Sequence, residues 1–213
     1  MGFKCGIVGL PNVGKSTLFN ALTKSSIPAE NFPFCTIEPN VGKVALPDKR
    51  LKNINDIVDS KKIIPASLDL VDIAGLVKGA SKGEGLGNAF LSNIREMNAL
   101  AHVVRCFDDD NVTHVDGSID PIRDAEIINL ELIFSDLETV TKRLTKCEKL
   151  LKTNDKKNKL EHEVLVKIKS ELDQGNLINI NDFDEESKIV LNSYQLLSSK
   201  PTFYIANISD DGS

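Results

Sequence analysis

Long apolar runs, clustered cysteines, internal repeats and an excess of positive charge are all missing from this chain of 213 residues. Because a membrane span needs about 18 or more consecutive apolar residues, and because no signal peptide opens the chain, we expect a cytoplasmic protein without membrane contact. The four cysteines are far apart and lack metal-ligand spacing, which favours reduced thiols over a disulfide framework or a zinc site. The net charge of -5 disfavours a general nucleic-acid coat but permits a local basic patch.

The composition, with 41% hydrophobic and 27% charged residues, is that of an ordinary globular protein, which we expect to be monomeric. The length permits one large domain, or one domain with an insertion. Strand and helix patterns alternate, which predicts an α/β fold with a doubly wound, mostly parallel sheet and ligands at the carboxyl ends of its strands. The expected strands are 3–8, 41–46, 67–71, 101–107 and 202–206, and the first expected helices are 15–23, 51–58 and 88–97.

One motif organises the chain: Gly9-Leu10-Pro11-Asn12-Val13-Gly14-Lys15-Ser16, between an apolar strand pattern and a helical pattern. This spacing and setting are typical of a G-x-x-x-x-G-K-[ST] phosphate loop. The backbone N–H groups of such a loop, together with the helix N-terminus, form a cradle for phosphate oxygens. Lys15 would reach the β- and γ-phosphates, and the hydroxyl of Ser16 would bind Mg2+. The nucleotide-binding residues predicted here are Asn12, Val13, Gly14, Lys15, Ser16 and Thr17.

Two further segments complete a predicted Mg2+ site. Asp72 ends an expected strand, where a Walker B carboxylate would hold Mg2+ through a water molecule opposite Ser16. Gly75 follows, and its N–H group would sense whether a γ-phosphate is present. Thr36, in a proline-rich loop, is predicted to close over Mg2+ from the other side, with Thr23 as its competitor. The predicted metal ligands are therefore Ser16, Thr36 and Asp72.

The group that directs the attacking water is not the usual one. Leu76 stands where Ras-like GTPases have a glutamine, and a leucine side chain cannot hydrogen-bond to water. Hydrolysis is therefore expected to be slow or to use another group. His114, on a polar loop, is the functional candidate, with the acidic residues 108–110 as alternatives and a plain surface histidine as the simpler interpretation. His102 lies in an apolar strand pattern and is interpreted as a core residue. The predicted catalytic residues are Lys15 and His114.

Base recognition is assigned to Asn207-Ile208-Ser209-Asp210, after the last expected strand. Guanine-specific proteins use N-K-x-D, whose carboxylate accepts hydrogen bonds from N1-H and the 2-amino group of guanine. In this chain the lysine is missing, but an aspartate keeps the fourth position. Asn207 and Asp210 are predicted nucleotide-binding residues, and the residues alone leave adenine and guanine both open.

From residue 120 onward the pattern is helical, over 121–151, 160–172 and 185–197. A polar break at 153–158 turns the chain, so we expect an antiparallel helical hairpin inserted at about 121–198. Between residues 141 and 170 ten basic residues stand against four acidic ones, and Lys142, Lys146 and Lys149 fall on one helix face. This basic face predicts a contact with ribosomal RNA, and a solvated pair of helices is the alternative.

Four segments together resemble the YchF branch of the Obg-like P-loop proteins, especially its bacterial members. They are residues 2–23, Asn31-Phe32-Pro33-Phe34-Cys35-Thr36 with the four residues after it, Asp72-Ile73-Ala74-Gly75-Leu76-Val77, and Lys82-Gly83-Glu84-Gly85-Leu86-Gly87-Asn88. The resemblance covers essentially the whole chain, strongly to about residue 107. It implies an Obg-type G domain that hydrolyses ATP, in spite of its ancestry, and associates with the ribosome. In this family a hydrophobic residue replaces the glutamine, as Leu76 does, and the loop matching His114 is the supposed substitute.

The chain departs from the family in two ways. The family usually carries N-x-x-E where this chain has Asp210, so the choice between ATP and GTP stays open. The family also continues with a further G-domain segment and a small C-terminal TGS domain, both absent here, so we expect an N-terminal fragment that lacks the last base-contacting loop. The functional hypothesis is a ribosome-associated ATPase switch. Its alternatives are a GTP-binding regulatory protein and a nucleotide-dependent binding module with incidental hydrolysis, while a P-loop kinase is disfavoured because no arginine-bearing lid is found.

Overall fold

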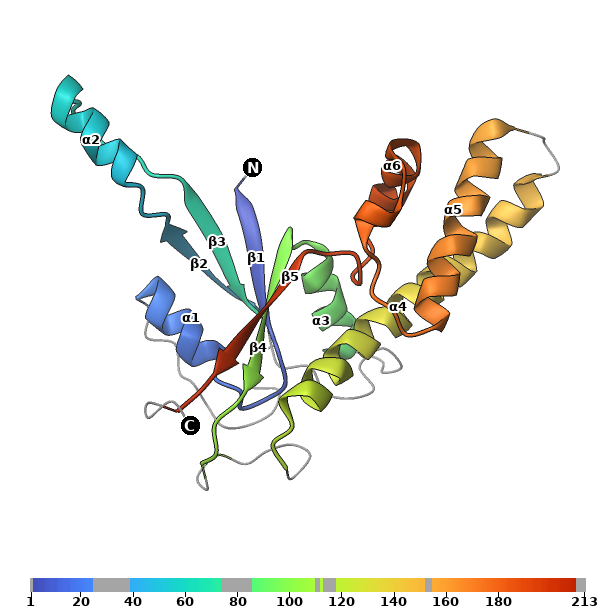
Figure 1. The fold of residues 1–213 in the computed structure, drawn as a ribbon, viewed down its shortest axis with the longest axis horizontal. Helices are drawn as coiled ribbons and strands as arrows, with labels where there is room; N and C mark the ends of the chain where they lie inside the picture. Colours follow the sequence, from blue (N-terminus) through green and yellow to red (C-terminus); the bar gives the residue numbers. More distant parts are fainter. Residues whose placement is uncertain are drawn as a thin grey trace.

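The computed structural model describes residues 2–24, 39–73, 86–109, 112, 118–151 and 155–209, arranged around a twisted β-sheet (Figure 1). Within these residues the strands are β1 (Phe3–Val8), β2 (Asn40–Ala45), β3 (Ser67–Asp72), β4 (Ala99–Arg105) and β5 (Thr202–Asn207), in the spatial order β2-β3-β1-β4-β5. β1, β3, β4 and β5 are parallel, and β2 runs antiparallel to β3. The predicted α/β fold with a mostly parallel sheet is confirmed.

Helices lie on both faces of this sheet. α1 (Lys15–Thr23) packs on one face, where a Cβ added to Gly42 of β2 would lie 2.2 Å from Cγ2 of Thr23. The strand register places Gly6 of β1 on the opposite face. A Cβ there would lie 2.8 Å from Cγ of Met97, which follows α3 (Leu86–Arg95). Helices on both faces of a parallel sheet make the doubly wound arrangement, in which ligands bind at the carboxyl ends of the strands.

A long helix joins the sheet to a second packing unit. α4 (Pro121–Leu150) begins against the sheet, where Asn129 donates a hydrogen bond of 3.1 Å to Oη of Tyr204 on β5. It then continues beyond the sheet beside α5 (Lys156–Asp173), and α6 (Glu185–Tyr194) lies against α5 after a 3-10 turn at Ile180–Asp182 (Figure 1). Two aliphatic cores result, one around Ile7 and Ile128 and one around Val140 and Ile168. Each fully buried aliphatic side chain contributes roughly 1.5–3 kcal/mol by leaving water.

Asp136, in the middle of α4, ties the hairpin to the chain that leads into β5. Its Oδ1 accepts a hydrogen bond of 3.0 Å from the N–H group of Leu197. Its Oδ2 accepts from both the N–H group and the hydroxyl of Ser198, at 2.7 and 2.6 Å. The side chain is fully buried, and burial raises the pKa of Asp136 while these three donors offset part of the rise. The carboxylate thus satisfies three donors that would otherwise be buried without partners.

Several element boundaries differ from those expected. β4 starts two residues earlier and ends at Arg105 instead of residue 107, and α3 covers 86–95 instead of 88–97. α5 begins at residue 156 instead of 160, because the carboxylate of Asp155 caps the helix by accepting from the N–H group of Lys157. α6 ends at residue 194 instead of 197, because Gln195 adopts a left-handed backbone conformation with φ of 50°.

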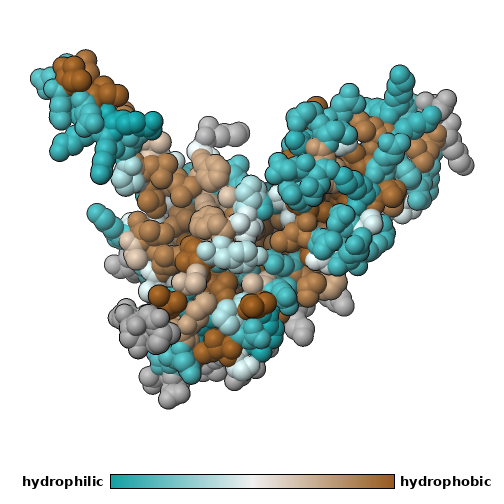
Figure 2. Space-filling view, in the orientation of Figure 1, coloured by the Kyte–Doolittle hydropathy of each residue, from teal (hydrophilic) through white to brown (hydrophobic). Residues whose placement is uncertain are grey.

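Apolar side chains remain exposed in three parts of the described surface. Leu130 and Phe134 of α4 are 41% and 45% exposed. The helix α2 (Lys49–Val58) projects from the sheet without a buried residue, and Phe203 of β5 is 52% exposed. Figure 2 shows hydrophobic residues across the front of the sheet and along one side of α2. Among the described residues, no helix has the length and apolarity needed to cross a membrane.

Candidate nucleotide site

The phosphate loop connects β1 to α1, and two of its residues have left-handed backbone conformations. Asn12 and Gly14 have φ angles of 61° and 94°, in the region that favours glycine. Steric space also excludes a side chain at Gly14, because an added Cβ would lie 2.4 Å from Nδ2 of Asn207. The carbonyl of Gly14 accepts from the N–H group of Leu18 at 3.0 Å, which closes the first turn of α1. The loop therefore ends at a helix N-terminus, as a phosphate site requires.

Lys15 lies almost wholly inside this loop. Its side chain is buried, and Nζ donates a hydrogen bond of 2.6 Å to the carbonyl oxygen of Leu10. Burial lowers the pKa of Lys15 to about 8, although the nearby carboxylate of Asp72 opposes the shift. A buried ammonium with a single hydrogen-bond partner among the described residues is destabilised relative to one in water. A phosphate group bound in the loop would supply the negative charge that this ammonium lacks.

Ser16 and Asp72 bring the ends of two elements together. The hydroxyl of Ser16, in the first turn of α1, donates a hydrogen bond of 2.7 Å to Oδ2 of Asp72 at the end of β3. Oδ1 of Asp72 is buried and has no hydrogen-bond partner among the described residues. Burial raises the pKa of Asp72, and the bond from Ser16 and the charge of Lys15 offset part of the rise.

These two residues fit Mg2+. The ion prefers oxygen ligands, takes few of them from protein and completes its octahedron with water and phosphate oxygens. A hydroxyl and a carboxylate at hydrogen-bond distance, with one carboxylate oxygen still unpaired, match that requirement. The pair at Ser16 and Asp72 was predicted from the sequence, whereas the third predicted ligand, Thr36, lies outside the described residues.

Asn207, predicted to contact the base, supports the phosphate loop. Its Nδ2 donates a hydrogen bond of 3.0 Å to the carbonyl oxygen of Val13, and its own carbonyl accepts from the N–H group of Cys106 at 2.8 Å. Because the partners of Asn207 are more than a hundred residues away in the sequence, no local pattern announces these contacts. The base contact of Asn207 stays a prediction.

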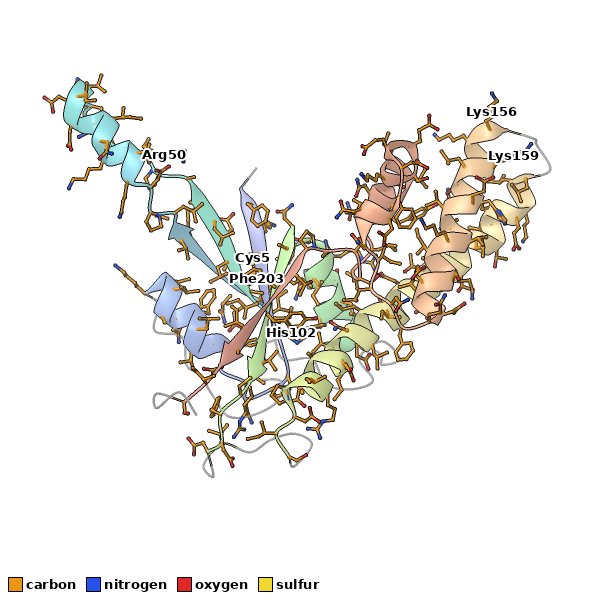
Figure 3. The ribbon with its side chains drawn as sticks, viewed as in Figure 1. Cys5, Arg50, His102, Lys156, Lys159 and Phe203 are labelled. Atoms are coloured by element: carbon orange, nitrogen blue, oxygen red, sulfur yellow. The ribbon has the colours of Figure 1, made fainter. Side chains whose placement is uncertain are left out.

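Of the other residues considered in the sequence analysis, the structure describes Thr17 and His102, and four lie outside the described residues. Thr17 is exposed on the first turn of α1, next to Ser16. His102 is buried in β4 beside the ring of Tyr204, with the ring centroids 5.1 Å apart (Figure 3). Burial and the charge of Lys15 lower the pKa of His102 to about 4, so the ring is neutral near pH 7 and behaves as the expected core residue. Four predicted positions lie outside the described residues: Gly75, Leu76, His114 and Asp210.

We compared the chain with known protein families, proteins and structures. Residues 4–159 match the family described as 50S ribosome-binding GTPase. The chain is 54% identical over 212 residues to the ribosome-binding ATPase YchF of Escherichia coli O157:H7, which covers 100% of this chain and 58% of that protein. It is 53% identical over 211 residues to that of Bacillus subtilis, covering 99% and 58%.

A solved structure agrees with these relatives. The structure of the Schizosaccharomyces pombe YchF GTPase superposes with a TM-score of 0.78 at 42% identity, over 99% of this chain and 57% of that one. The chain thus spans 58% of the length of the two curated relatives. The resemblance inferred from the motifs is confirmed over the whole chain. With a G-x-x-x-x-G-K-[ST] loop before α1, an aspartate at the end of β3 and this degree of identity, the chain belongs to the 50S ribosome-binding GTPase family and is homologous to the YchF proteins.

Proposed function

We propose that this chain is the nucleotide-binding part of an Mg2+-dependent ATP hydrolase that acts as a switch on the ribosome in the cytoplasm. The observation that carries the proposal is the buried, unpaired Oδ1 of Asp72 beside the hydroxyl of Ser16, at the edge of the sheet that also holds the phosphate loop. The names of the curated relatives, ribosome-binding ATPase, support the choice of reaction and partner.

The chain's own residues would bind and orient the triphosphate. Lys15 would exchange its bond to Leu10 for the β- and γ-phosphate oxygens, and the N–H groups of the loop would hold the same oxygens. Ser16 and Asp72, with Thr36 as the third proposed ligand, would hold Mg2+, which would withdraw charge from the phosphates. Gly75 would donate its N–H group to the γ-phosphate and so report its presence.

The attacking water needs a separate partner in this proposal. Leu76 cannot orient it, so intrinsic turnover should be slow. His114 is the proposed substitute, and the acidic residues 108–110 are its competitors. A neutral histidine accepts a proton near physiological pH, which suits this role.

The preference for ATP over GTP is proposed from the relatives' names and is opposed by one residue. Asp210 is the residue type that guanine recognition uses, and it follows Asn207, the last residue of β5, by three positions. A GTP-binding regulatory protein is therefore the second candidate. A binding module in which hydrolysis is incidental is the third.

The ribosomal contact is proposed to lie on the hairpin of α4 and α5. Among the described basic residues there, Lys142 and Lys149 are exposed on α4, and Lys156 and Lys159 lie at the start of α5 near the tip (Figure 3). Clustered positive charge on one projection of a net acidic chain suits the phosphates of ribosomal RNA.

The decisive experiment is calorimetric titration of the full-length protein with ATP and with GTP, each with Mg2+ and with a chelator. The proposal expects tighter binding of ATP, Mg2+ dependence, and phosphate release that ribosomes accelerate. Tighter binding of GTP would favour the second candidate. Turnover that no ribosome preparation changes would favour the binding module.

A further inference from the structure

Two side chains of α4 bind β5 and the chain that leads into it. Asn129 donates a hydrogen bond of 3.1 Å to Oη of Tyr204, in the middle of the strand. Asp136 accepts hydrogen bonds of 3.0, 2.7 and 2.6 Å from Leu197 and Ser198, shortly before the strand. Asn129 and Asp136 are about two helical turns apart, so they lie on the same side of α4. The helix that carries the hairpin is therefore attached to β5 and to its entry.

The short connection between Ser198 and β5 is itself held in place. Nζ of Lys200 donates to the carbonyl of Met97 at 2.6 Å, just before β4. The carbonyl of Pro201 accepts a hydrogen bond of 2.9 Å from the N–H group of Leu100. The proline also fixes its own φ angle. The connection therefore has little conformational freedom, and a displacement of α4 at Asp136 acts on β5 instead of being absorbed by a flexible linker.

β5 lies at the edge of the described sheet and pairs there with β4 alone. Phe203 and Tyr204 in its middle are each 52% exposed. A strand with one neighbour and half-exposed side chains is held by fewer contacts than an inner strand, so its path changes at a lower cost in free energy. Of the described strands, β5 is thus well suited to follow a movement of the hairpin.

The carboxyl end of β5 contacts the phosphate loop directly. Nδ2 of Asn207 donates a hydrogen bond of 3.0 Å to the carbonyl of Val13. The same atom lies so close to Gly14 that an added Cβ there would be 2.4 Å away. A shift of Asn207 by a few tenths of an ångström must therefore change this hydrogen bond or displace Gly14, because packing of this density transmits strain. Lys15 and Ser16 follow Gly14 directly in the chain.

We propose that β5 couples the hairpin to the nucleotide site, through Asp136 before the strand and Asn207 at its end. A partner bound to the hairpin changes the affinity of the phosphate loop for nucleotide, and nucleotide changes the affinity for that partner by the same factor. This inference rests on the proposed function, which puts the nucleotide at the phosphate loop and the ribosomal contact on the hairpin. Asp136 is a positioning residue that touches neither ligand.

The test measures the Kd of a non-hydrolysable ATP analogue for the full-length protein, with and without saturating ribosomes. In the wild type the two Kd values should differ by about fivefold or more. Asp136→Asn keeps the size of the side chain but sets an NH2 group against buried donors. Its two Kd values should differ by less than about twofold. Its Kd without ribosomes should stay within about twofold of the wild type, because Asn207 still binds Val13.

Asn207→Ala removes the other end of the coupling. Its two Kd values should also become similar, whatever the change in their absolute size. The double variant with Asp136→Asn should show no further loss, because residues that act through one connection are not additive. Full coupling in Asp136→Asn, or independent and additive losses in the two single variants, would overturn the proposal.

Tyr194→Phe is the matched control. The hydroxyl of Tyr194 donates to Glu161 of α5 and accepts from Arg143 of α4, so it joins the helices of the hairpin without a bond to β5. This variant should keep the wild-type ratio of the two Kd values. An equal loss of coupling in Tyr194→Phe would show that any loosening of the hairpin has the same effect, and it would overturn the role of Asp136.

A second measurement needs no ribosome. The amides of Leu197 and Ser198 donate to Asp136, so their hydrogen exchange reports on that attachment. Saturating nucleotide analogue should change their exchange rates in the wild type but not in Asn207→Ala. Unchanged rates in the wild type would overturn the coupling. If ribosomes failed to bind the wild type, the proposed ribosomal contact would fail, and the exchange rates alone would decide whether β5 couples the two parts.

Discussion

The hydroxyl of Ser16 and Oδ2 of Asp72 are 2.7 Å apart, although 56 residues separate them in the chain. Before any metal binds, the two proposed ligands are thus held together by a hydrogen bond. β3 is paired within the sheet and α1 packs against β3, so the ligand pair needs little reorganisation. Such preorganisation lowers the entropic cost of binding an ion.

Ser16→Ala should therefore weaken the dependence of ATP affinity on Mg2+. The gain in ATP affinity that Mg2+ gives the wild type should shrink by roughly tenfold or more, because a direct ligand is removed. Calorimetric titrations with Mg2+ and with a chelator measure this difference. Ser193→Ala, the same change on the exposed side of α6, should leave it unaltered. Identical Mg2+ dependence in the wild type and in Ser16→Ala would remove Ser16 from the metal site.

Lys15→Met should abolish nucleotide binding and stabilise the nucleotide-free protein. Folding lowers the pKa of Lys15 from 10.5 to about 8. Between those values the unfolded chain binds more protons than the folded one, so wild-type stability should rise with pH across that window. Below about pH 8 the ammonium of Lys15 carries the full penalty of burial, on the order of 3 kcal/mol.

Urea unfolding at about pH 7 and about pH 9.5 measures the effect of Lys15. The variant should be the more stable protein at the lower pH, and its advantage should narrow at the higher one. An advantage independent of pH would show that the ammonium of Lys15 is not the source of the penalty.

His114→Ala should lower kcat by roughly a hundredfold or more, as expected when a group that positions or activates water is removed. The Kd for ATP should change little. His162→Ala, on α5 within the hairpin, is the control and should turn over as the wild type does. A steady-state assay of ATP hydrolysis with full-length protein measures kcat. Equal kcat values for His114→Ala and the wild type would mean that His114 is a surface residue without a catalytic role.

Asp136→Ala should destabilise the fold by about 3–5 kcal/mol, because the substitution leaves three buried donors without their carboxylate. Asp173→Ala removes a half-exposed carboxylate that pairs with Lys169 on α5, and it should cost at most about 1 kcal/mol. Urea midpoints of the two variants at equal m-values provide the comparison. Similar midpoints would mean that the hydrogen bonds of Asp136 to Leu197 and Ser198 do not contribute to the free energy of unfolding.

Reversing Lys142, Lys146 and Lys149 to Glu should weaken ribosome association and flatten its salt dependence, by about one unit of slope for each RNA phosphate that the variant no longer neutralises. Intrinsic ATPase activity should persist, since the phosphate loop lies at the sheet. Lys142 already pairs with Glu138 on the same helix, so its share should be the smallest of the three.

Reversal of Lys49, Lys52 and Lys61 to Glu supplies the control for the hairpin variant. These lysines lie on or just after α2, are exposed, and give the same change of net charge. Co-sedimentation across a salt series separates the two sets. Equal weakening in both would indicate an effect of total charge, and no weakening in either would exclude the Lys142 face as the site that touches the ribosome.

Local patterns were enough to predict the phosphate loop and the elements beside it. The bounds of α1 and β1 follow from a glycine-lysine motif and an apolar run, which act over a few residues. Pairing between distant residues has no such pattern. The contacts of Asn207 with Val13, and of Asp136 with Ser198, arise only when the sheet and the hairpin are assembled.

The misplaced end of β4 has a related cause. Residues Cys106 and Phe107 read as a continuation of the apolar strand, and only the structure shows Arg105 turned onto the carbonyl of Phe107. In the sequence, Arg105 is a single charged residue inside an apolar run, and nothing in that pattern indicates that the strand ends there. The use of the donor nitrogens of Arg105 depends on the path of the loop, which the composition of the strand does not determine.

The bond between Asn207 and Val13 also sets an order of events during synthesis. Its two partners are 194 residues apart, so at ordinary translation rates roughly 10–40 s pass between them. During that interval the phosphate loop lacks the hydrogen bond from Asn207, and the sheet lacks β5, the strand to which Asn207 belongs. A nascent chain should therefore gain its full affinity for nucleotide in one late step, after residue 207 has emerged, and not gradually as the loop and α1 fold.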